Sequence, residues 1–437
     1  MPEYFFEQMR ELLGGEYADF KRAYDEKPRH KALRVNTKKI APDAFLRLTD
    51  IASRRNPLCE NSFYTAVKPS LDPLYHAGLY YMQEPSASAA VAAFAPFIGT
   101  RVLDLCSAPG GKATQAAAYM RGGVIFCNDV EQKRIAALRE NIERLGIVNA
   151  TLTRATAAEY VRYGGEEWFD TLIVDAPCSG GGMMRYENVP LSAEIVAGCA
   201  KRQREILDSA ARLLQNGGYM LYSTCTFSRE ENEDNIEYMI GKGFATVDMP
   251  LRDGETRGIG MPDARRIYPH RFDGEGHFYC VLQKRVGGVS GLPFSKTETT
   301  KEHIGGAVVD CIKTDGAILL PTYIARIGVR TVRRGIEVYD GAQAGRCAVR
   351  DRRSRIAEVS HALTHALSRE QVTGFGAVEL SESDALKYIR GEELAADAPK
   401  GTLVATYKGY ALGLVKSARS GTGEPVLKNL YPKALRV

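Results

Sequence analysis

Five short apolar runs alternate with longer segments of helical pattern in the middle of the chain, and this alternation constrains the fold more than any other feature. Strands separated by helices predict a mostly parallel sheet with helices on both faces. We therefore expect an α/β, doubly wound domain. The expected strands lie at 101–105, 123–127, 151–153, 170–174 and 219–223, and the expected helices at 112–120, 131–145 and 199–214.

The sequence on either side of this region predicts further units. An amphipathic helix pattern followed by a short strand begins the chain, and a segment rich in Gly, Ser, Thr and Lys follows the central region. Segments of that composition are typical of linkers. The units that we expect are a small α/β unit over 1–85, the central domain over 86–286 with a closing hairpin at 266–284, a linker over 287–306, a basic α+β subdomain over 307–372 and a compact barrel-like module over 373–437.

Composition limits the class of protein. The chain has 437 residues, of which 44% are hydrophobic and 25% charged, as in ordinary soluble proteins. Its most apolar stretch, 87–98, contains Pro96 and is shorter than the roughly 20 residues of a membrane span. The N-terminus lacks the pattern of a secretory signal, and the nine cysteines include no Cys-x-x-Cys pair. We expect a cytoplasmic protein with reduced thiols, no membrane contact and no metal.

The positive charge is unevenly distributed. The net charge is only +5, but nine arginines lie between 326 and 355 against three acidic residues. Such a run is either a solvated basic surface or a patch that contacts phosphates. The sequence leaves both interpretations open.

A glycine-rich turn follows the first expected strand of the central domain. A triphosphate-binding loop is disfavoured, because Cys106 stands where its first glycine belongs and Ala113 follows Lys112. The dinucleotide pattern Gly-x-Gly-x-x-Gly is also absent, although Asp129 at the end of the next strand suits ribose hydroxyls. S-adenosylmethionine, which has no phosphates, fits what remains. A turn that merely connects strand and helix is the alternative.

Cys178 and Cys225 each follow an apolar run that predicts a buried strand. Because the carboxyl ends of parallel strands meet at one edge of a sheet, the two thiols are expected to share a pocket. Either could be only a small buried hydrophobe. Carbon 5 of a pyrimidine, however, is alkylated only after a thiolate adds to carbon 6. Asp175, if burial raises its pKa, would protonate or hydrogen-bond the ring nitrogen. The residues alone do not tell which cysteine attacks.

Six segments together resemble one family over nearly the whole chain. They are 33–37, 78–87, 104–112, 175–180, 222–227 and 269–278. The chain resembles the bacterial RsmF-like (Fmu/Sun) group of 16S rRNA cytosine carbon-5 methyltransferases. The resemblance implies a Rossmann-like class I methyltransferase sheet, an N-terminal RNA-binding unit and a C-terminal PUA-like RNA-binding module. It also implies S-adenosylmethionine as cofactor and ribosomal RNA as partner, and we expect a monomer.

The resemblance further assigns roles to residues. It implies that Cys225 is the nucleophile, that Cys178 helps to release the product, and that Lys112 lies near the reacting ring. It implies that Asp175 reaches the cofactor or the base. Thr156 occupies the place of an acidic residue that the family usually has near the adenine. The expected cofactor-binding residues are Cys106, Ser107, Ala108, Pro109, Gly110, Gly111, Lys112, Asp129, Arg134, Thr156 and Asp175.

The C-terminal half offers two further candidates. Tyr431 and the flanking lysines would suit contacts to phosphates and an exposed base, unless this is an ordinary small barrel. His361 and His365 are spaced four apart on a predicted helix, but the glutamate of a His-Glu-x-x-His motif is missing and no third ligand stands out. We expect a surface or core pair there and no metal site.

The function expected from these observations is methyl transfer from S-adenosylmethionine to carbon 5 of cytidine in small-subunit ribosomal RNA, through a covalent cysteine adduct. A tRNA methyltransferase with the same chemistry is one alternative. A non-catalytic RNA-binding factor of ribosome assembly is another. A small-molecule methyltransferase is a weaker one, because it would not need the basic C-terminal half.

Overall fold

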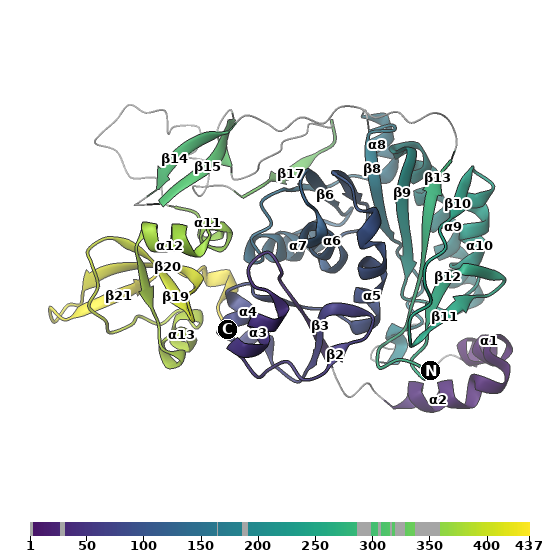
Figure 1. Ribbon diagram of the computed structural model, residues 1–437, viewed down its shortest axis with the longest axis horizontal. Helices are drawn as coiled ribbons and strands as arrows, with labels where there is room; N and C mark the ends of the chain where they lie inside the picture. The colour runs from purple at the N-terminus through teal and green to yellow at the C-terminus, as the bar shows by residue number, and fades with distance from the viewer. Residues whose placement is uncertain are drawn as a thin grey trace.

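The computed structural model describes residues 3–26, 31–163, 165–185, 191–285, 299–304, 307–314, 317–319, 328–336 and 359–437. Most of the arginine-rich run 326–355 falls outside these residues. A large twisted sheet forms one side of the molecule, and a smaller module that contains the C-terminal strands forms the other (Figure 1). Among the described residues, no helix has both the length and the apolar composition needed to cross a bilayer.

The central sheet has ten strands in the described chain, and its middle five are parallel, in the order β7-β6-β5-β8-β9. The chain runs outward from β5 in both directions, so the strand order reverses between β5 and β8. Open sheets of this kind bind their ligands at such a point. The expected doubly wound, mostly parallel sheet is therefore confirmed. The five strands are β5 (Arg101–Asp104), β6 (Val124–Asn128), β7 (Ala150–Thr153), β8 (Phe169–Asp175) and β9 (Leu214–Thr224).

Antiparallel strands extend both edges of this sheet. Beyond β9 follow β13 and then β12 and β11, and β10 pairs with β13. The expected closing hairpin is present as β12 and β13, in which Ile267 lies opposite His277. These strands are β10 (Phe244–Thr246), β11 (Glu255–Gly258), β12 (Met261–Ile267) and β13 (His277–Lys284).

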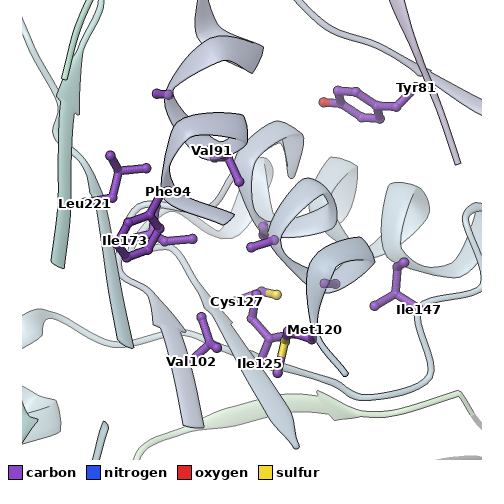
Figure 2. Packing of buried hydrophobic residues seen from close by; sticks show 14 of the residues in the cluster. Tyr81, Val91, Phe94, Val102, Met120, Ile125, Cys127, Ile147, Ile173 and Leu221 are labelled. Carbon is purple, nitrogen blue, oxygen red and sulfur yellow. The ribbon is translucent and has the colours of Figure 1, made fainter. Parts of the chain in front are cut away.

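Alternate residues of the parallel strands enter two separate cores. Val102, Ile125 and Ile173 face one layer of helices, where they pack with Val91 and Phe94 (Figure 2). Their neighbours, such as Leu103 and Phe126, face the other layer. Full burial of such a side chain stabilises the fold by about 1.5–3 kcal/mol. A strand shifted by one residue would turn every side chain to the opposite layer, and the packing of both cores would be lost. The first layer comprises α5 (Pro85–Phe94), α6 (Gly111–Tyr119) and α7 (Gln132–Arg144), and the second α8 (Ala157–Arg162), α9 (Ala193–Leu213) and α10 (Glu233–Ile240).

The expected N-terminal unit over 1–85 packs in two parts, a helical pair and a small sheet. Helices α1 (Glu3–Leu13) and α2 (Tyr17–Asp25) bury Phe5, Phe20 and Tyr24 against Phe227 and Tyr268 of the central domain. Their aromatic faces thus pack against the central domain. The second part is a sheet in the order β2-β3-β1-β4. Its elements are β1 (Lys31–Val35), α3 (Pro42–Leu48), β2 (Arg55–Asn56), β3 (Cys59–Thr65), α4 (Pro73–His76) and β4 (Tyr80–Met82).

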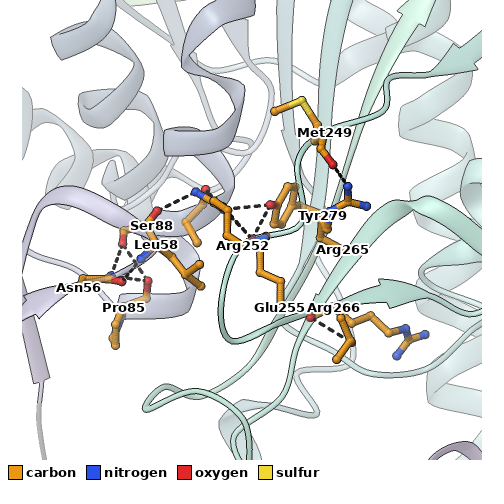
Figure 3. Close-up of polar contacts among 12 residues, drawn as sticks. Asn56, Leu58, Pro85, Ser88, Met249, Arg252, Glu255, Arg265, Arg266 and Tyr279 are labelled. Atoms are coloured by element: carbon orange, nitrogen blue, oxygen red, sulfur yellow. Dashed lines mark hydrogen bonds and ion pairs between the residues drawn. The ribbon is translucent and has the colours of Figure 1, made fainter.

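Buried polar contacts fix this small sheet to the central domain. The Arg252 guanidinium donates to the Leu58 carbonyl at 2.8 Å, and also binds Glu255 at 2.6 Å and the Tyr279 hydroxyl at 2.9 Å (Figure 3). On the other side, Arg34 of β1 donates to the Thr114 hydroxyl of α6 at 2.8 Å. The small sheet thus contacts the helix that follows the glycine-rich turn.

The expected units after the central domain stay a prediction, and the structure gives the elements that they contain. Part of the expected linker 287–306 forms β14 (Thr300–Ile304), which pairs with β15 (Ala307–Thr314). In the expected subdomain 307–372, β17 (Thr331–Arg334) pairs with β7 and supplies partners for the backbone groups of that edge strand. Helix α12 (Arg369–Phe375) spans the expected boundary at 372. A further short strand is β16 (Ala317–Leu319).

The C-terminal module packs against the small N-terminal sheet. Its sheet has the order β18-β19-β20-β21, and its apolar residues share one core with Leu33 and Tyr80 of the N-terminal part. Figure 1 shows the module beside α3 and α4. Its elements are α11 (His361–Ala366), α12, β18 (Ala377–Glu379), α13 (Glu382–Ile389), β19 (Thr402–Tyr407), β20 (Tyr410–Arg419) and β21 (Pro425–Asn429).

Candidate active site

The glycine-rich turn leaves β5 and leads directly into α6. Gly110 has a positive φ of 112°, a conformation that L residues rarely adopt, and it stands immediately before the helix. Arg134 of α7 holds the turn from the side, donating to the Ala108 carbonyl at 2.5 Å and lying 3.3 Å from Asp129 Oδ2. The structure thus brings together residues 106–112, Asp129 and Arg134, as the expected cofactor site requires.

Two buried carboxylate oxygens at this turn accept no hydrogen bond, Asp104 Oδ2 and Asp129 Oδ2, although the Arg134 guanidinium lies 3.3 Å from the second. Burial, together with the nearby Asp175 charge, raises the pKa of Asp104 to about 7. Buried acceptors of this kind call for a ligand that supplies donors. The ribose hydroxyls and the amino group of S-adenosylmethionine are such donors, so the residues present fit this cofactor. Asp104 was not among the candidates from the sequence, although it begins the motif 104–112.

Thr156 lies after β7 and caps helix α8. Its hydroxyl accepts a hydrogen bond from the Glu159 N–H at 3.2 Å, and the Glu159 carboxylate accepts from the Thr156 N–H at 2.6 Å. This reciprocal pair is a capping box. The Thr156 side chain therefore has a structural role, and its contact with adenine stays a prediction.

The two cysteines lie side by side at the carboxyl ends of neighbouring parallel strands. Asp175 of β8 stands opposite Ser223 of β9, and the chain then places Cys178 Sγ 3.2 Å from Cys225 Sγ, both half-buried. The two strand-end thiols thus lie next to each other, and the pocket that they are expected to share stays a prediction. We call residues 104–112, 175–182 and 223–226 together the cysteine edge. No group of side chains in the described part of the chain has the composition of a metal site.

The two thiols share one hydrogen bond, in which either sulfur can be the donor. That hydrogen bond and burial raise the pKa of Cys178 well above that of an ordinary thiol, and the nearby Glu231 charge acts in the same direction. A cysteine attacks as its thiolate. The assignment of the attacking sulfur to Cys225 stays a prediction.

An ion pair lies next to the thiols. Lys112 Nζ is 2.8 Å from Asp175 Oδ1, and the Ser223 hydroxyl donates to the same oxygen at 2.9 Å. Burial would raise the pKa of Asp175, but Lys112, His277 and Ser223 together hold it below its ordinary value. The proton-donating Asp175 considered from the sequence is therefore wrong, because its strand ends against the first turn of α6, where Lys112 stands.

Two further residues that lie next to the cysteine edge were not among the candidates from the sequence. His277, the first residue of β13, is buried, and its Nε2 has no hydrogen-bond partner. Burial, followed by the Lys112 charge, lowers the pKa of His277 to about 3, so its imidazole is neutral. Glu231, which is fully buried, accepts from the Ser179 backbone N–H at 2.9 Å. The only signals were the position of His277 in the motif 269–278 and a polar run after Cys225.

Comparisons with known proteins agree with this geometry. Models described as 16S rRNA methyltransferase RsmB/F, the N-terminal domain of 16S rRNA methyltransferase RsmF, and the methyltransferase RsmF PUA domain match residues 91–283, 1–85 and 375–437. Ribosomal RNA small subunit methyltransferase F of Escherichia coli is 32% identical, over 99% of this chain and 96% of that protein. The chain belongs to the RsmF family. The expected S-adenosylmethionine cofactor and PUA-like module are thereby confirmed.

Other relatives match a smaller part of the chain. Ribosomal RNA small subunit methyltransferase F of Vibrio vulnificus is 35% identical over 65% of this chain and 64% of that protein. A crystal structure of a methyltransferase homolog protein from Pyrococcus horikoshii is 28% identical, with a TM-score of 0.57, and covers 64% of this chain and 93% of that one. NSun6 from the same organism, 23% identical with a TM-score of 0.58, covers 65% and 98% and shows the fold alone.

The C-terminal candidates lie away from the cysteine edge of this RsmF-family chain. Tyr431 is only 3% exposed, and its hydroxyl lies 2.8 Å from His76 Nδ1. The expected stacking of Tyr431 on an RNA base is therefore wrong, because the ring fills the interface with the small N-terminal sheet. His361 packs edge-on against both Tyr431 and His365. As expected, these histidines form a core pair. We call His76, His361, His365, Tyr388 and Tyr431 the histidine cluster.

Proposed function

We propose that this protein transfers a methyl group from S-adenosylmethionine to carbon 5 of a cytidine in 16S ribosomal RNA, through a covalent bond between Cys225 and carbon 6. The observation that carries the proposal is the 3.2 Å separation of the two sulfur atoms beside the Lys112–Asp175 ion pair. A pair of thiols supports a reaction in which one sulfur forms a bond to the base and a second group assists its departure.

The first step forms the adduct. A target cytidine inside a helix would first be flipped out of its stack. The Cys225 thiolate then bonds to carbon 6, and the electron pair of the ring double bond moves to carbon 5 and the ring nitrogen. Lys112 supplies positive charge for the ring, and the ionised Asp175 accepts a hydrogen bond from the exocyclic amino group. When bound, S-adenosylmethionine supplies an electrophilic methyl group, which carbon 5 accepts.

The second step releases the product. A water molecule acts as base and takes the carbon-5 proton, and the electron pair of that C–H bond re-forms the ring double bond. The bond between carbon 6 and sulfur breaks, and its electron pair returns to Cys225 as the thiolate. We assign Cys178 to this stage, because its S–H lies within hydrogen-bond distance of the departing sulfur.

Two substitutions test the assignment. Cys225→Ala should abolish both methylation and adduct formation, whereas Cys178→Ala should accumulate a covalent RNA adduct that migrates slowly on a denaturing gel. Cys199→Ala, on the half-buried face of α9, is the control and should behave as the parent protein. Adduct in the Cys225 variant and none in the Cys178 variant would reverse the roles.

The substrate is tested separately. Naked 16S rRNA, small ribosomal subunits and bulk tRNA should be offered with labelled S-adenosylmethionine, followed by bisulfite sequencing of the labelled RNA. The proposal expects label at a cytidine of 16S rRNA or of the subunit. Label confined to tRNA would make the protein a tRNA methyltransferase. Binding without transfer to any of the three would make it an RNA-binding factor.

A further inference from the structure

A single buried carboxylate connects the two cysteine loops. Glu231 lies between β9 and α10, is 0% exposed, and accepts four hydrogen bonds. Its Oε2 accepts from the Ser179 N–H at 2.9 Å and from Gln203 Nε2 at 2.9 Å. Its Oε1 accepts from the hydroxyls of Ser179 and Ser228, the latter at 2.9 Å.

These donors come from both sides of the thiol pair. Ser179 follows Cys178 directly, and its hydroxyl also lies 2.9 Å from the hydroxyl of Thr226, which follows Cys225 directly. Gln203, the third partner, donates to the carbonyl of Pro177 at 3.0 Å, just before Cys178. The Glu231 side chain is therefore the common point through which both loops are held.

Glu231 has no ion-pair partner among the described residues. Two residues further along, the equally buried Glu233 is paired with Arg266 at 2.6 Å, whereas the ion pairs of the described residues do not include Glu231. A buried carboxylate without a counter-ion is costly unless hydrogen-bond donors replace water, and here they do. An apolar side chain would fill the space at lower cost but would neither bind the loops nor carry charge.

The Glu231 charge acts on the thiol of Cys178. The groups that act on the Cys178 thiol are Cys225 at the end of β9, Glu231 before α10, and the backbone N–H of Gly180. The first two favour the protonated thiol, and the Gly180 N–H opposes them. The Glu231 charge thus acts on the thiol of a cysteine whose loop its hydrogen bonds also hold.

We propose that Glu231 is a positioning residue that fixes the two cysteine loops at their working separation and whose charge acts on the Cys178 thiol. This inference rests on the proposed function, since it explains how the two cysteines are held for the reaction. It assigns Glu231 no contact with RNA or cofactor. Its effect is carried by Ser179, Ser228, Gln203 and the charge.

The test reads the Cys178 thiol directly and needs no RNA. In the full chain carrying Cys225→Ala, the rate of iodoacetamide alkylation at Cys178 is followed against pH by mass spectrometry. Adding Glu231→Gln should move the midpoint to lower pH by about one unit, since a nearby negative charge is removed. Glu255→Gln is the matched control, because its side chain is as buried but is bound by Arg252 and Tyr279, outside the cysteine loops. An unchanged midpoint in Glu231→Gln would overturn the electrostatic part.

Turnover tests the positional part. With Cys225 present, Glu231→Gln and Ser179→Ala should each lower kcat about tenfold or more while leaving KM for RNA unchanged, because the loops lose shared hydrogen bonds. Ser179→Ala keeps the charge, so its alkylation midpoint should stay with the parent. If Glu231→Gln does not fold, Ser179→Ala decides, and a parental kcat in that variant would overturn the inference. Failure of the proposed function would instead show as no adduct in Cys178→Ala, which leaves the alkylation result intact.

Discussion

The cysteine edge and the histidine cluster are both built from buried ionisable side chains, yet burial has opposite consequences in the two. At the cysteine edge, Asp175 stays ionised because Lys112 lies 2.8 Å away, and Lys112, His277 and Ser223 outweigh the burial that would raise its pKa. In the histidine cluster, burial lowers the pKa of His361 to about 4, and the nearby His76 acts in the same direction. For Asp175 the adjacent ammonium outweighs burial, whereas no opposite charge acts on His361 and burial disfavours its charged form. The ion pair beside the thiols is thus kept charged, whereas His361 at the packed interface is neutral.

The largest effect is expected from removing the counter-charge at the cysteine edge. Lys112→Met should raise the pKa of Asp175, because burial then acts unopposed by the ammonium. It should lower single-turnover methyl transfer by about 100- to 1,000-fold, the usual loss for one preorganised electrostatic group. Lys38→Met is the control, since Lys38 only donates to the Met120 carbonyl at 3.0 Å. If the single-turnover rate of the Lys112 variant lies within a few-fold of the parent rate, the ion pair is dispensable. The contrast with the histidine cluster would then have no catalytic meaning.

The histidine cluster should respond to acid. In the folded protein His361 has a pKa of about 4, below the ordinary value of 6.5. As pH falls below about 6.5, the unfolded chain binds a proton that the folded chain does not, so the free energy of unfolding falls until the folded pKa is reached. The loss should be roughly 3 kcal/mol for this one group. Above pH 6.5 His361 should no longer make the free energy of unfolding depend on pH.

Hydrogen exchange of the β20 amides, corrected for intrinsic rates, measures this loss at pH 7 and pH 4.5. His361→Gln should flatten the pH dependence, whereas His303→Gln, at an exposed position of β14, should leave it unchanged. Equal acid sensitivity in the parent and the His361 variant would refute the assignment.

A backbone change should separate geometry from charge at the cysteine edge. A Cβ on Gly182 would lie 3.0 Å from the Cys225 carbonyl and 3.1 Å from the Glu275 carbonyl, and backbone atoms do not yield easily. Gly182 also donates its N–H to the Cys225 carbonyl at 2.9 Å. Gly182→Ala should therefore shift Cys178 relative to Cys225 and lower kcat about 10- to 100-fold with unchanged cofactor affinity. In Gly198→Ala, where a Cβ meets nothing within 4 Å, kcat should not change.

The sequence predicted the chemistry of the cysteine edge better than its electrostatics. Periodicity placed the five parallel strands within a few residues, and strand ends then implied that Cys178 and Cys225 would meet. The state of Asp175 was not predictable, because it depends on a 2.8 Å contact with a residue 63 positions earlier in the chain. Glu231 was missed for the same reason, since its partners Ser179 and Gln203 are distant in sequence.

The strand pairing outside the central domain was not predictable for a related reason. Composition suggested a linker and a separate basic subdomain, yet β17 pairs with β7 across a long stretch of chain. Edge strands take their partners from tertiary structure, which local composition does not record. Tyr431 was likewise assigned to RNA because tyrosine near lysines is typical of RNA-binding surfaces. Only the packing against His76 and Tyr388 shows that it faces inward.

The C-terminal module should therefore contact RNA through outward charge and not through Tyr431. Lys416 and Lys428 are exposed and lie directly opposite each other across β20 and β21. Like charges in such a pair repel, and a phosphate between them would relieve the repulsion. The double variant Lys416→Gln, Lys428→Gln should bind an rRNA fragment about tenfold more weakly at 0.15 M salt, and the slope of log affinity against log salt should fall by about 1.5 to 2. Lys387→Gln, whose lysine is paired with Asp384 at 3.1 Å, should have a much smaller effect. An unchanged salt slope in the double variant would place the RNA contact on another face. This is the smallest expected effect, because two screened surface charges act here and no buried pair is broken.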